Sequence, residues 1–434
     1  MSIAIIGAGI GGLVTALSLH RAGFGDIRIY ERVRQLRPLG VGINLLPHAV
    51  RELTELGLRD DVEAIATAPR RLSYVNRHGQ PIWSEARGTA AGYRWPQLSV
   101  HRGELQLALV EAVRERLGPD TILLGHRLTG LDATDDGAPC ARALFETSGG
   151  EVAVDADLVI GADGIHSAVR ALRYPDEGAP RWNGLTLWRG TAVVPEFLDG
   201  ATMIMAGDDQ LKFVAYPLRR EPDGSVAVNF IAEQRSDGSR AETADWNRPV
   251  PIAPIAELFS AWRFDWLDIP AVIANAQELL EYPMVDRDPL PRWTFGRSTL
   301  LGDAAHSMYP NGSNGASQAI LDARTLAYSL ATAGDLVEGL RRYEDTRRPA
   351  TADLLALTRQ QGPERVMVLA HERAPDGFAD ITDVIPAAEL REIADGYKRT
   401  AGFHPEALNT RASLDARVGA GAGAPAATSG EALP

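Results

Sequence analysis

The sequence has 434 residues, of which 45% are hydrophobic and 23% are charged, and its formal net charge is -13. A chain of this length exceeds one compact core, so we expect two domains. The acidic balance argues against nucleic acid as a partner, because phosphate binding needs a clustered positive surface. Cys140 is the single cysteine, which excludes an intrachain disulfide and a cysteine-built metal site and is typical of a reducing compartment.

The N-terminus shows no pattern of a targeting segment. The first expected strand begins at Ile3, which leaves no room for a cleavable signal before it. No apolar run approaches the roughly 20 residues that a membrane span requires. We therefore expect a cytoplasmic protein without a membrane partner and without a metal, present as a monomer or homodimer.

The chain opens with the pattern of a βαβ unit. Ile3–Ile6 is a continuous apolar run, typical of a parallel strand covered on both faces. A helical pattern follows from Gly12 to about Arg21, and Gly23 marks its end. The second strand covers Ile27–Tyr30 and runs into Glu31.

The loop between this first strand and helix fits the dinucleotide fingerprint G-x-G-x-x-G. Gly7 permits a tight turn, Gly9 lets the backbone approach a pyrophosphate, and Gly12 allows close packing of helix on strand. The helix N-terminus then faces the phosphate charge. Glu31, nineteen residues past Gly12, can accept hydrogen bonds from ribose hydroxyls. The pattern predicts a dinucleotide site but does not distinguish FAD from NAD.

Two later segments repeat the combination of an apolar strand and a Gly/Asp turn. Asp157–Ile160 runs into Gly161–Gly164, and Ser298–Leu301 runs into Gly302–Asp303. The carboxyl ends of the three strands can lie side by side at the sheet edge where open α/β sheets bind ligands.

The pattern of hydrophobic residues changes between about residues 182 and 285. Short alternating runs with aromatic residues occur at Leu187–Val194, Lys212–Tyr216 and Val226–Ile231, which indicates an antiparallel sheet. After about residue 335 the pattern is helical, and from Ala412 onward small residues and proline dominate. We expect a second domain inserted into the first, followed by helices and a tail that cannot bury a core.

Three fingerprints in a fixed order carry a resemblance to a known family. Gly7–Gly12 is followed by Asp163–Arg170 (DGIHSAVR) and by Gly302–His306 (GDAAH). Over roughly residues 3 to 350, the chain resembles the FAD-dependent aromatic hydroxylases related to p-hydroxybenzoate and salicylate hydroxylases. Within that family it is similar to the phenazine hydroxylase subgroup of pyocyanin biosynthesis, with the closer match at residues 37–44, 281–291 and 310–322.

The resemblance implies an α/β fold with an α+β insert. It consists of a Rossmann-like FAD-binding domain with a parallel sheet, an inserted antiparallel-sheet substrate domain and C-terminal helices. We expect the discontinuous FAD-binding domain to comprise 1–72, 98–178 and 286–360, the substrate domain 73–97 and 179–285, a C-terminal helical segment 361–411, and a disordered tail 412–434.

The resemblance also implies a single-component FAD-dependent monooxygenase. NAD(P)H would bind transiently and reduce FAD, dioxygen would add at flavin C4a, and the hydroperoxide would hydroxylate an electron-rich ring. The subgroup implies a phenazine-like, other fused-ring or carboxylated aromatic substrate, hydroxylated with or without loss of a carboxylate. The regiochemistry and the choice between NADH and NADPH stay open.

Individual cofactor contacts follow from the same resemblance. Asp303 would bond the ribityl chain, Asp163 and Gly164 would support the FAD and nicotinamide sites, and Arg102 would contact the cofactor. The loop Gly40–Gly42 matches the one against which the flavin ring moves. The expected cofactor-binding set is Gly7, Gly9, Gly12, Glu31, Arg32, Val41, Gly42, Arg102, Leu128, Asp163, Gly164, Asp303, Pro310, Gly315 and Ala316.

The segment Pro310–Ala319 is expected to carry the flavin chemistry, with Pro310, Gly312 and Gly315, in its first part 310–316, acting through backbone. Its small residues leave main chain against the flavin, and a helix from about Ala316 aims its positive end at the ring system that becomes anionic on reduction. The commoner family pattern has proline at Asn311, glycine at Ser313 and asparagine at Ser317. This departure weakens the transfer of a substrate from salicylate-type members.

Substrate contacts are expected among large side chains of the second domain, although about half of these would serve as ordinary core residues. Arg189 can pair with a substrate carboxylate or with one of the many acidic side chains. His306 could act as a base, but its family position favours a backbone role near the cofactor. The substrate candidates are Trp188, Arg189, Phe213, Tyr216, Phe230, Tyr282, Met284 and Tyr309.

Other functions explain less of the sequence. A flavin-dependent halogenase needs a W-x-W-x-I-P motif, which Phe264–Pro270 does not supply. An NAD-linked dehydrogenase accounts for residues 7–31 but leaves the Asp163 and Asp303 segments without a role. A flavoprotein reductase or oxidase, or a non-catalytic flavin-binding module, is compatible with the sequence.

Overall fold

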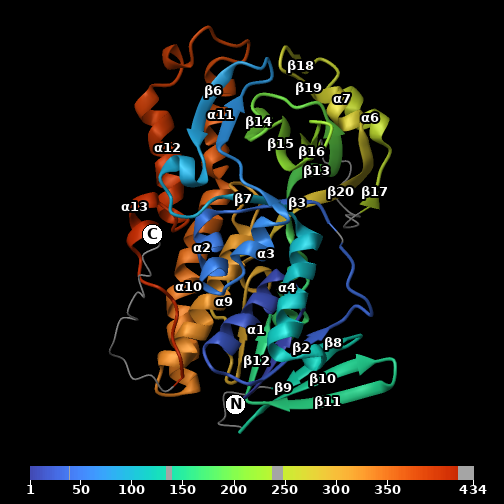
Figure 1. Cartoon of the computed structure of the whole chain (residues 1–434), viewed down its shortest axis with the longest axis vertical. Coiled ribbons are helices and arrows are strands. Elements are labelled where there is room, and N and C mark those ends of the chain that lie inside the picture. The colour runs from blue at the N-terminus through green and yellow to red at the C-terminus, as the bar shows by residue number, and fades with distance from the viewer. Residues whose placement is uncertain (39, 133–138, 237–247, 419–434) are drawn as a thin grey trace, which may run out of the picture.

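A computed structural model describes residues 1–38, 40–132, 139–236 and 248–418 (Figure 1). A parallel sheet and its helices occupy one end of the long axis, and a large antiparallel sheet occupies the other. Helices of the C-terminal third run along both parts (Figure 1). The mixed α/β architecture with an antiparallel sheet and C-terminal helices is the fold class that the sequence predicts.

The parallel sheet has the order β21-β12-β1-β2-β8 within the described residues. Its central strands form because apolar runs are buried on both faces, as in β1, where Ile5 is fully buried. Ile6 lies opposite Gly161, and Gly161 lies opposite Leu300. The three predicted strands therefore end side by side. Their bounds are β1 Ser2–Ile6, β2 Asp26–Glu31, β8 Ile122–Leu124, β12 Leu158–Gly161 and β21 Ser298–Leu300.

Helices cover this sheet, and α1 packs against both α9 and α4. Helix α9 begins one residue earlier than expected, at Gly315, and is almost entirely buried. The helices of this part are α1 Ile10–Arg21, α2 Pro47–Glu55, α3 Arg59–Glu63, α4 Arg102–Leu117, α5 Ala168–Arg173, α8 Asp303–His306, α9 Gly315–Thr332 and α10 Leu336–Arg359, with the 3-10 turn η2 Pro119–Thr121.

Two smaller antiparallel sheets flank the parallel one. One joins a hairpin to the strand before it, and the other carries the loop that ends at Gly42. Leu128 lies buried in the first of these sheets and pairs with Phe145. Their strands are β9 Arg127–Asp132, β10 Ala141–Thr147 and β11 Gly150–Ala156, and β3 Gly42–Leu45, β4 Ala66–Thr67 and β7 Leu98–His101.

The large sheet has the order β17-β20-β13-β16-β15-β14-β5-β6 among the described residues. Only its pair β14–β5 is parallel within that set. The short helices α6 and α7 pack beside its β13 and β20 strands. The bounds are β5 Arg71–Val75, β6 Pro81–Ala86, β13 Arg181–Val194, β14 Thr202–Gly207, β15 Leu211–Arg220, β16 Val226–Arg235, β17 Arg248–Pro249 and β20 Ala276–Asp286, followed by α6 Ile252–Leu258, α7 Ile269–Ala274 and the two-stranded β18 Arg263–Phe264 and β19 Leu267–Asp268, with η1 at Gly88–Ala91.

The C-terminal segment folds back over both sheets. Residues 412–418, part of the tail expected to be disordered, bond to the parallel-sheet domain: Asp415 pairs with Arg21, and the Val418 amide donates to the Ala22 carbonyl at 2.9 Å. Residues 419–434 lie outside the described part. The C-terminal elements are η3 Gly362–Glu364, α11 Arg365–Arg373, η4 Ile381–Asp383, α12 Ala387–Thr400 and α13 Pro405–Thr410.

Candidate active site

The N-terminal glycine loop has the geometry of a phosphate cradle. Gly7 has φ +105°, where L side chains are disfavoured, and a Cβ there would lie 2.6 Å from the Ala162 carbonyl oxygen. A Cβ on Gly12 would lie 2.0 Å from the Gly7 carbonyl oxygen, so Gly12 permits close packing of helix on strand. A Cβ on Gly9 would meet nothing within 4 Å. The open space at Gly9, beside the N-terminus of α1, fits a pyrophosphate.

Glu31 closes this loop at the end of β2. Its Oε2 accepts the Ala8 amide hydrogen at 2.8 Å, and its Oε1 accepts that of Val33 at 3.0 Å. The side chain is only partly buried, so its carboxylate can also accept hydrogen bonds from a ribose. Arg32 is exposed beside Glu31. The pKa of His166 is lowered mainly by burial, and the positive charges of Arg287 and Arg32 lower it further.

Asp163 supports its segment through the local backbone. One carboxylate oxygen accepts the Ser167 hydroxyl at 2.6 Å, and the other accepts the Ala168 amide at 2.7 Å. Burial raises the pKa of Asp163, although these hydrogen bonds favour the charged form. The residue thus fixes the start of α5, and Gly164 turns the chain there with φ +77°. The sequence resemblance implied cofactor support at both positions.

Asp303 is exposed at the start of α8, next to the N-terminus of α9. A Cβ added at Gly315 would lie 3.9 Å from its Oδ1, so the carboxylate and the helix N-terminus border the same space. The buried side chain of Arg170 stabilises α8, because its Nη1 donates to the carbonyls of Ala304 and Ala305. This exposed carboxylate is free to face a polyhydroxylated chain.

His306 is a structural residue in this arrangement. It is 3% exposed, and its Nε2 lies 2.5 Å from Asp322 Oδ2. Asp322 also pairs with Arg347 at 2.6 Å and accepts the Gly302 amide at 3.0 Å. Burial opposes ionisation of Asp322, but His306 and Arg347 outweigh it and hold its pKa at about 2. A buried charged network therefore fixes the turn before Asp303.

The loop at Gly42 is bound to the large sheet. The Gly42 amide donates to Asn229 Oδ1 at 2.7 Å, and its carbonyl accepts the Tyr216 hydroxyl at 2.6 Å and Arg189 Nη2 at 3.0 Å. A Cβ on Gly42 would clash with Asn229 at 2.7 Å. Burial raises the pKa of Tyr216 to about 12, so the phenol remains a donor.

Val41 and Arg102 hold the other side of the same loop. The Val41 carbonyl accepts the Arg102 amide at 3.0 Å. The Arg102 side chain is exposed and passes Gly40, where an added Cβ would lie 3.5 Å from Arg102 Cδ. A cation thus stands at the mouth of the loop, available for an anionic ligand.

The segment 310–316 presents backbone to solvent. Pro310 is exposed, and Gly312, Gly315 and Ala316 are partly exposed. Gly312 and Ser313 both lie in the left-handed region, with φ +74° and +59°. The first-turn amides of α9 have no partner within the helix and are directed toward the space beside Asp303. A helix N-terminus at this place favours an anionic ring system.

The candidate substrate residues separate by sheet face. Trp188, Phe213 and Phe230 point into a core with Phe259 and Trp262, on the face that α6 and α7 cover. The structure does not bring these three to the Gly42 loop. On the other face, Tyr216 and Arg189 bond Gly42, the Arg189 guanidinium lies 5.8 Å from the Tyr282 ring centroid, and Met284 and Tyr309 pack with Tyr216 in one cluster.

Comparison with known proteins decides the family. A family model described as an FAD binding domain matches residues 1–221 and 271–358. The chain belongs to this family. Its relatives include the phenazine 1,6-dicarboxylic acid hydroxylase PhzS of Lysobacter antibioticus, 45% identical over 91% of this chain and 96% of the relative, and the 3-amino-4-hydroxybenzoate 2-monooxygenase of Streptomyces cremeus, 32% identical over 92% and 96%.

The crystal structure of a HpxO variant of Klebsiella pneumoniae in complex with FAD is similar to this chain with a TM-score of 0.76 and 25% identity, covering 94% of this chain and all of that one. The protein is an FAD-dependent aromatic monooxygenase. The dehydrogenase and binding-module alternatives are thereby set aside. The cradle at Gly9, the exposed Asp303 and the N-terminus of α9 are the places that fit its FAD.

Several residues that contact the candidate site were not predicted from the sequence. Asn229 is fully buried and bonds Gly42, while Tyr397 and Glu364 contact the 310–316 segment from the C-terminal helices. A buried asparagine within an apolar strand, Val226–Ile231, was the one available signal for Asn229. Tyr397 and Glu364 sit in ordinary amphipathic helical sequence and carry no such signal.

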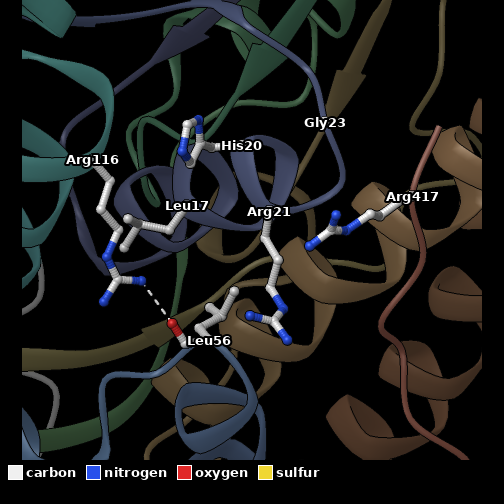
Figure 2. Close-up of a pocket in the computed structure, with 7 residues that line it drawn as sticks. All are labelled: Leu17, His20, Arg21, Gly23, Leu56, Arg116 and Arg417. Carbon is white, nitrogen blue, oxygen red and sulfur yellow. Dashed lines mark hydrogen bonds between the residues drawn. The ribbon is translucent and has the colours of Figure 1, made fainter. Parts of the chain in front are cut away.

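The monooxygenase also has a pocket unrelated to these groups (Figure 2). It lies at the C-terminal end of α1, has a volume of about 410 Å³, and is lined by Leu17, His20, Arg21, Gly23, Leu56, Arg116 and Arg417. Its lining on α1 starts at Leu17, and roughly 10 Å of helix, at 1.5 Å per residue, separate that residue from the N-terminus of α1. His20 and Arg21 at the C-terminus of α1, and Arg116 at that of α4, are favoured by the helix dipoles, which explains these three without a ligand.

Within the described residues, no helix combines the length and the apolar character that a membrane crossing requires.

Proposed function

We propose that this monooxygenase hydroxylates a planar carboxylated aromatic, most closely of the phenazine type, and consumes NAD(P)H and dioxygen. The observation that carries the substrate class is the position of Arg189. Its guanidinium lies over Tyr282 and beside Gly42, on the sheet face that meets the FAD-binding domain. A cation held there suits the carboxylate of a ring compound.

Arg189 forms no ion pair among the described residues, although Glu233 is close enough to interact with it electrostatically. Among the described residues its side chain donates to the Gly42 carbonyl, and its Nε is buried without a hydrogen-bond partner. The sequence left open whether Arg189 pairs with an acid or with a substrate. A buried donor without a partner is costly, and a carboxylate oxygen would satisfy it.

The relatives support the same class. Their names specify a phenazine dicarboxylic acid, an aminohydroxybenzoate and, for the enzyme of Bordetella bronchiseptica that is 31% identical over 80% of this chain, 6-hydroxynicotinate. Each of these compounds combines an aromatic ring with a carboxylate. The 45% identity to the phenazine enzyme favours a fused ring.

The residues around Arg189 perform the positioning. Val214, Ile231 and Met284 supply an apolar floor for a flat ring on the same sheet face. The main chain at Pro310–Gly315 and the loop at Gly42 would border the ring system of bound FAD. Bound FAD supplies the oxygen-transferring chemistry, while these side chains orient the ring and exclude water.

An Arg189→Met variant tests the proposal. With a carboxylated fused-ring substrate, kcat/KM should fall by about 10- to 100-fold, because a charge-assisted hydrogen bond contributes roughly 1.5–3 kcal/mol. With the same ring lacking the carboxylate, kcat/KM should change less than threefold. Equal losses on both compounds would reject the carboxylate role, and turnover confined to non-aromatic compounds would reject the substrate class.

Two parts of the proposal need separate measurements. Comparing the oxidation of NADH and of NADPH, with and without the aromatic, determines the reductant, and aromatic-stimulated oxidation is expected with at least one of them. Mass spectrometry of the product distinguishes hydroxylation at a free position from replacement of the carboxylate. Light scattering of the purified protein tests the expected monomer or homodimer.

A further inference from the structure

A buried ion cluster joins the large sheet to the C-terminal segment. Lys212 Nζ on β15 lies 2.8 Å from Glu233 Oε2 on β16 and also bonds Glu364 Oε2 in η3. All three residues are at most 6% exposed. Burial opposes the charge on Lys212, but the two carboxylates outweigh it and raise the pKa of the amine. Buried ion pairs seldom add net stability, so their retention suggests a geometric role.

The cluster is connected to the segment 310–316. Glu364 Oε2 also accepts Asn311 Nδ2 at 3.0 Å. The Asn311 carbonyl accepts the Tyr397 hydroxyl at 3.1 Å, and Asn314 Nδ2 donates to that same hydroxyl at 2.5 Å. Side chain and main chain of the segment are therefore both held from the C-terminal helices.

The conformation of this segment depends on such support. Gly312 and Ser313 are consecutive left-handed residues, a geometry that costs energy at a non-glycine position. A Cβ on Gly312 would lie 2.0 Å from the Tyr397 hydroxyl oxygen, so Tyr397 fills the space against the loop. Without these contacts, the 310–316 segment would lack the interactions that stabilise its left-handed conformation.

The same strand is also bonded to the Gly42 loop. Tyr216, four residues after Lys212 on β15, donates to the Gly42 carbonyl at 2.6 Å. Side chains four residues apart on a strand share a face and lie about 13 Å apart. Strand β15 thus contacts one loop directly through Tyr216 and the other through Lys212, Glu364 and Asn311.

We propose that β15 sets the spacing between the Gly42 loop and the 310–316 segment, with Lys212, Glu364 and Asn311 as positioning residues. The sequence resemblance implies that the flavin ring of bound FAD would lie against both of these loops, and the inference rests on that expected FAD site. The sheet that carries the candidate substrate contacts then determines how closely the loops approach the ring. The C-terminal segment is part of the active site in this arrangement, although it supplies no catalytic residue.

A double-mutant cycle between Asn311→Ala and Glu364→Gln tests the link. Each single variant should raise the Kd for FAD about three- to tenfold and shift the visible absorption and midpoint potential of the bound flavin. Glu364→Gln removes the ion pair that fixes Glu364, and Asn311→Ala removes the hydrogen bond from Asn311 to Glu364. Because these are successive links of one connection, the double variant should match the stronger single variant. Additive effects, or an unchanged flavin spectrum in Asn311→Ala, would overturn the proposal.

Asp208→Asn is the matched control. Asp208 is a buried carboxylate in the turn between β14 and β15, paired with Arg77 at 2.5 Å and 3.9 Å from His371 Nδ1, and none of its described bonds reaches either loop. It should lower the midpoint of thermal unfolding as Glu364→Gln does, while leaving the Kd for FAD and the flavin spectrum unchanged. An equal spectral shift in Asp208→Asn would show a general loss of stability and contradict the proposal. If Glu364→Gln fails to fold, the Kd for FAD and the flavin spectrum of Asn311→Ala alone test the proposal, because that substitution removes no buried charge.

Discussion

The two faces of the large sheet differ although the same strands build them. Trp188 and Arg189 are neighbours in sequence, as are Phe213 and Lys212, and Phe230 and Asn229. The first member of each pair packs in the apolar core beneath α6 and α7. The second member is polar and forms bonds that reach the FAD-binding domain or the C-terminal segment.

This difference shows how a strand combines a structural and a functional role. Because side chains alternate between faces, one residue step separates core packing from the site. The core face needs shape and volume, whereas the other face needs specific donors, acceptors and charges. Substitutions on the two faces should therefore affect different measurements.

The largest expected effect is on the core face. Phe230→Ala should destabilise the fold by about 3–5 kcal/mol, because a buried ring is replaced by a cavity. Urea unfolding measures this loss. The Kd for FAD and the flavin spectrum of the molecules that remain folded should not change. If Phe230→Ala shifted the flavin spectrum as much as Asn311→Ala does, the two sheet faces would not differ in their effect on the flavin.

A smaller effect is expected from the buried charges behind Asp303. The pKa of Asp322 is about 2 in the folded protein and near 4 when unfolded. A depressed pKa contributes stability above about pH 4 that is lost as the pH falls toward 2, in this case about 2 kcal/mol. Asp322→Asn should remove this contribution near neutral pH and flatten the pH dependence of unfolding between pH 4 and 2. If the pH dependence of unfolding between pH 4 and 2 were the same in Asp322→Asn, the proposed role of the Asp322 network would be contradicted.

Tyr216→Phe should cost about 1 kcal/mol of stability, the net value of one hydrogen bond. On the functional face, however, the loss of the bond to Gly42 should also loosen the loop and raise the Kd for FAD. Chemical unfolding and FAD titration measured on the same variant separate the two effects. If Tyr216→Phe lowered stability without changing the Kd for FAD, Tyr216 would have only a structural role, like the residues of the core face.

Ser313→Gly is expected to have the smallest effect. Ser313 has φ +59°, so glycine removes backbone strain, but it also raises the entropy of the unfolded chain. The net change should be a stabilisation below about 1 kcal/mol, measured by thermal unfolding. A clear destabilisation would mean that the Ser313 side chain itself supports the loop.

Local sequence patterns predicted the part of the fold that depends on local physics. Continuous apolar runs ending in Gly/Asp turns identified the strands that meet at Ile6, Gly161 and Leu300. Steric requirements at Gly7 and Gly12 are visible in the sequence because no other residue fits there. The alternating runs likewise predicted the antiparallel sheet.

Contacts between distant segments were not predictable in the same way. Alternation shows that Trp188 and Arg189 face opposite sides, but not which side α6 and α7 cover. The bond from Tyr397 to Asn311 spans 86 residues, and that from Asn311 to Glu364 spans 53. Their helices look amphipathic whether or not they contact a loop. The tail composition likewise did not indicate the ion pair between Asp415 and Arg21.

The contact of Tyr397 with the 310–316 segment also constrains how the protein is made. The glycine loop at Gly7 is synthesised 390 residues before Tyr397. At 5–20 residues per second, about 20–80 s separate the synthesis of β1 from that of Tyr397. Strand β1 must also wait for β12 and β21 before its sheet neighbours exist. The contacts that hold the 310–316 segment in place therefore form only after Tyr397 has been synthesised, long after the glycine loop.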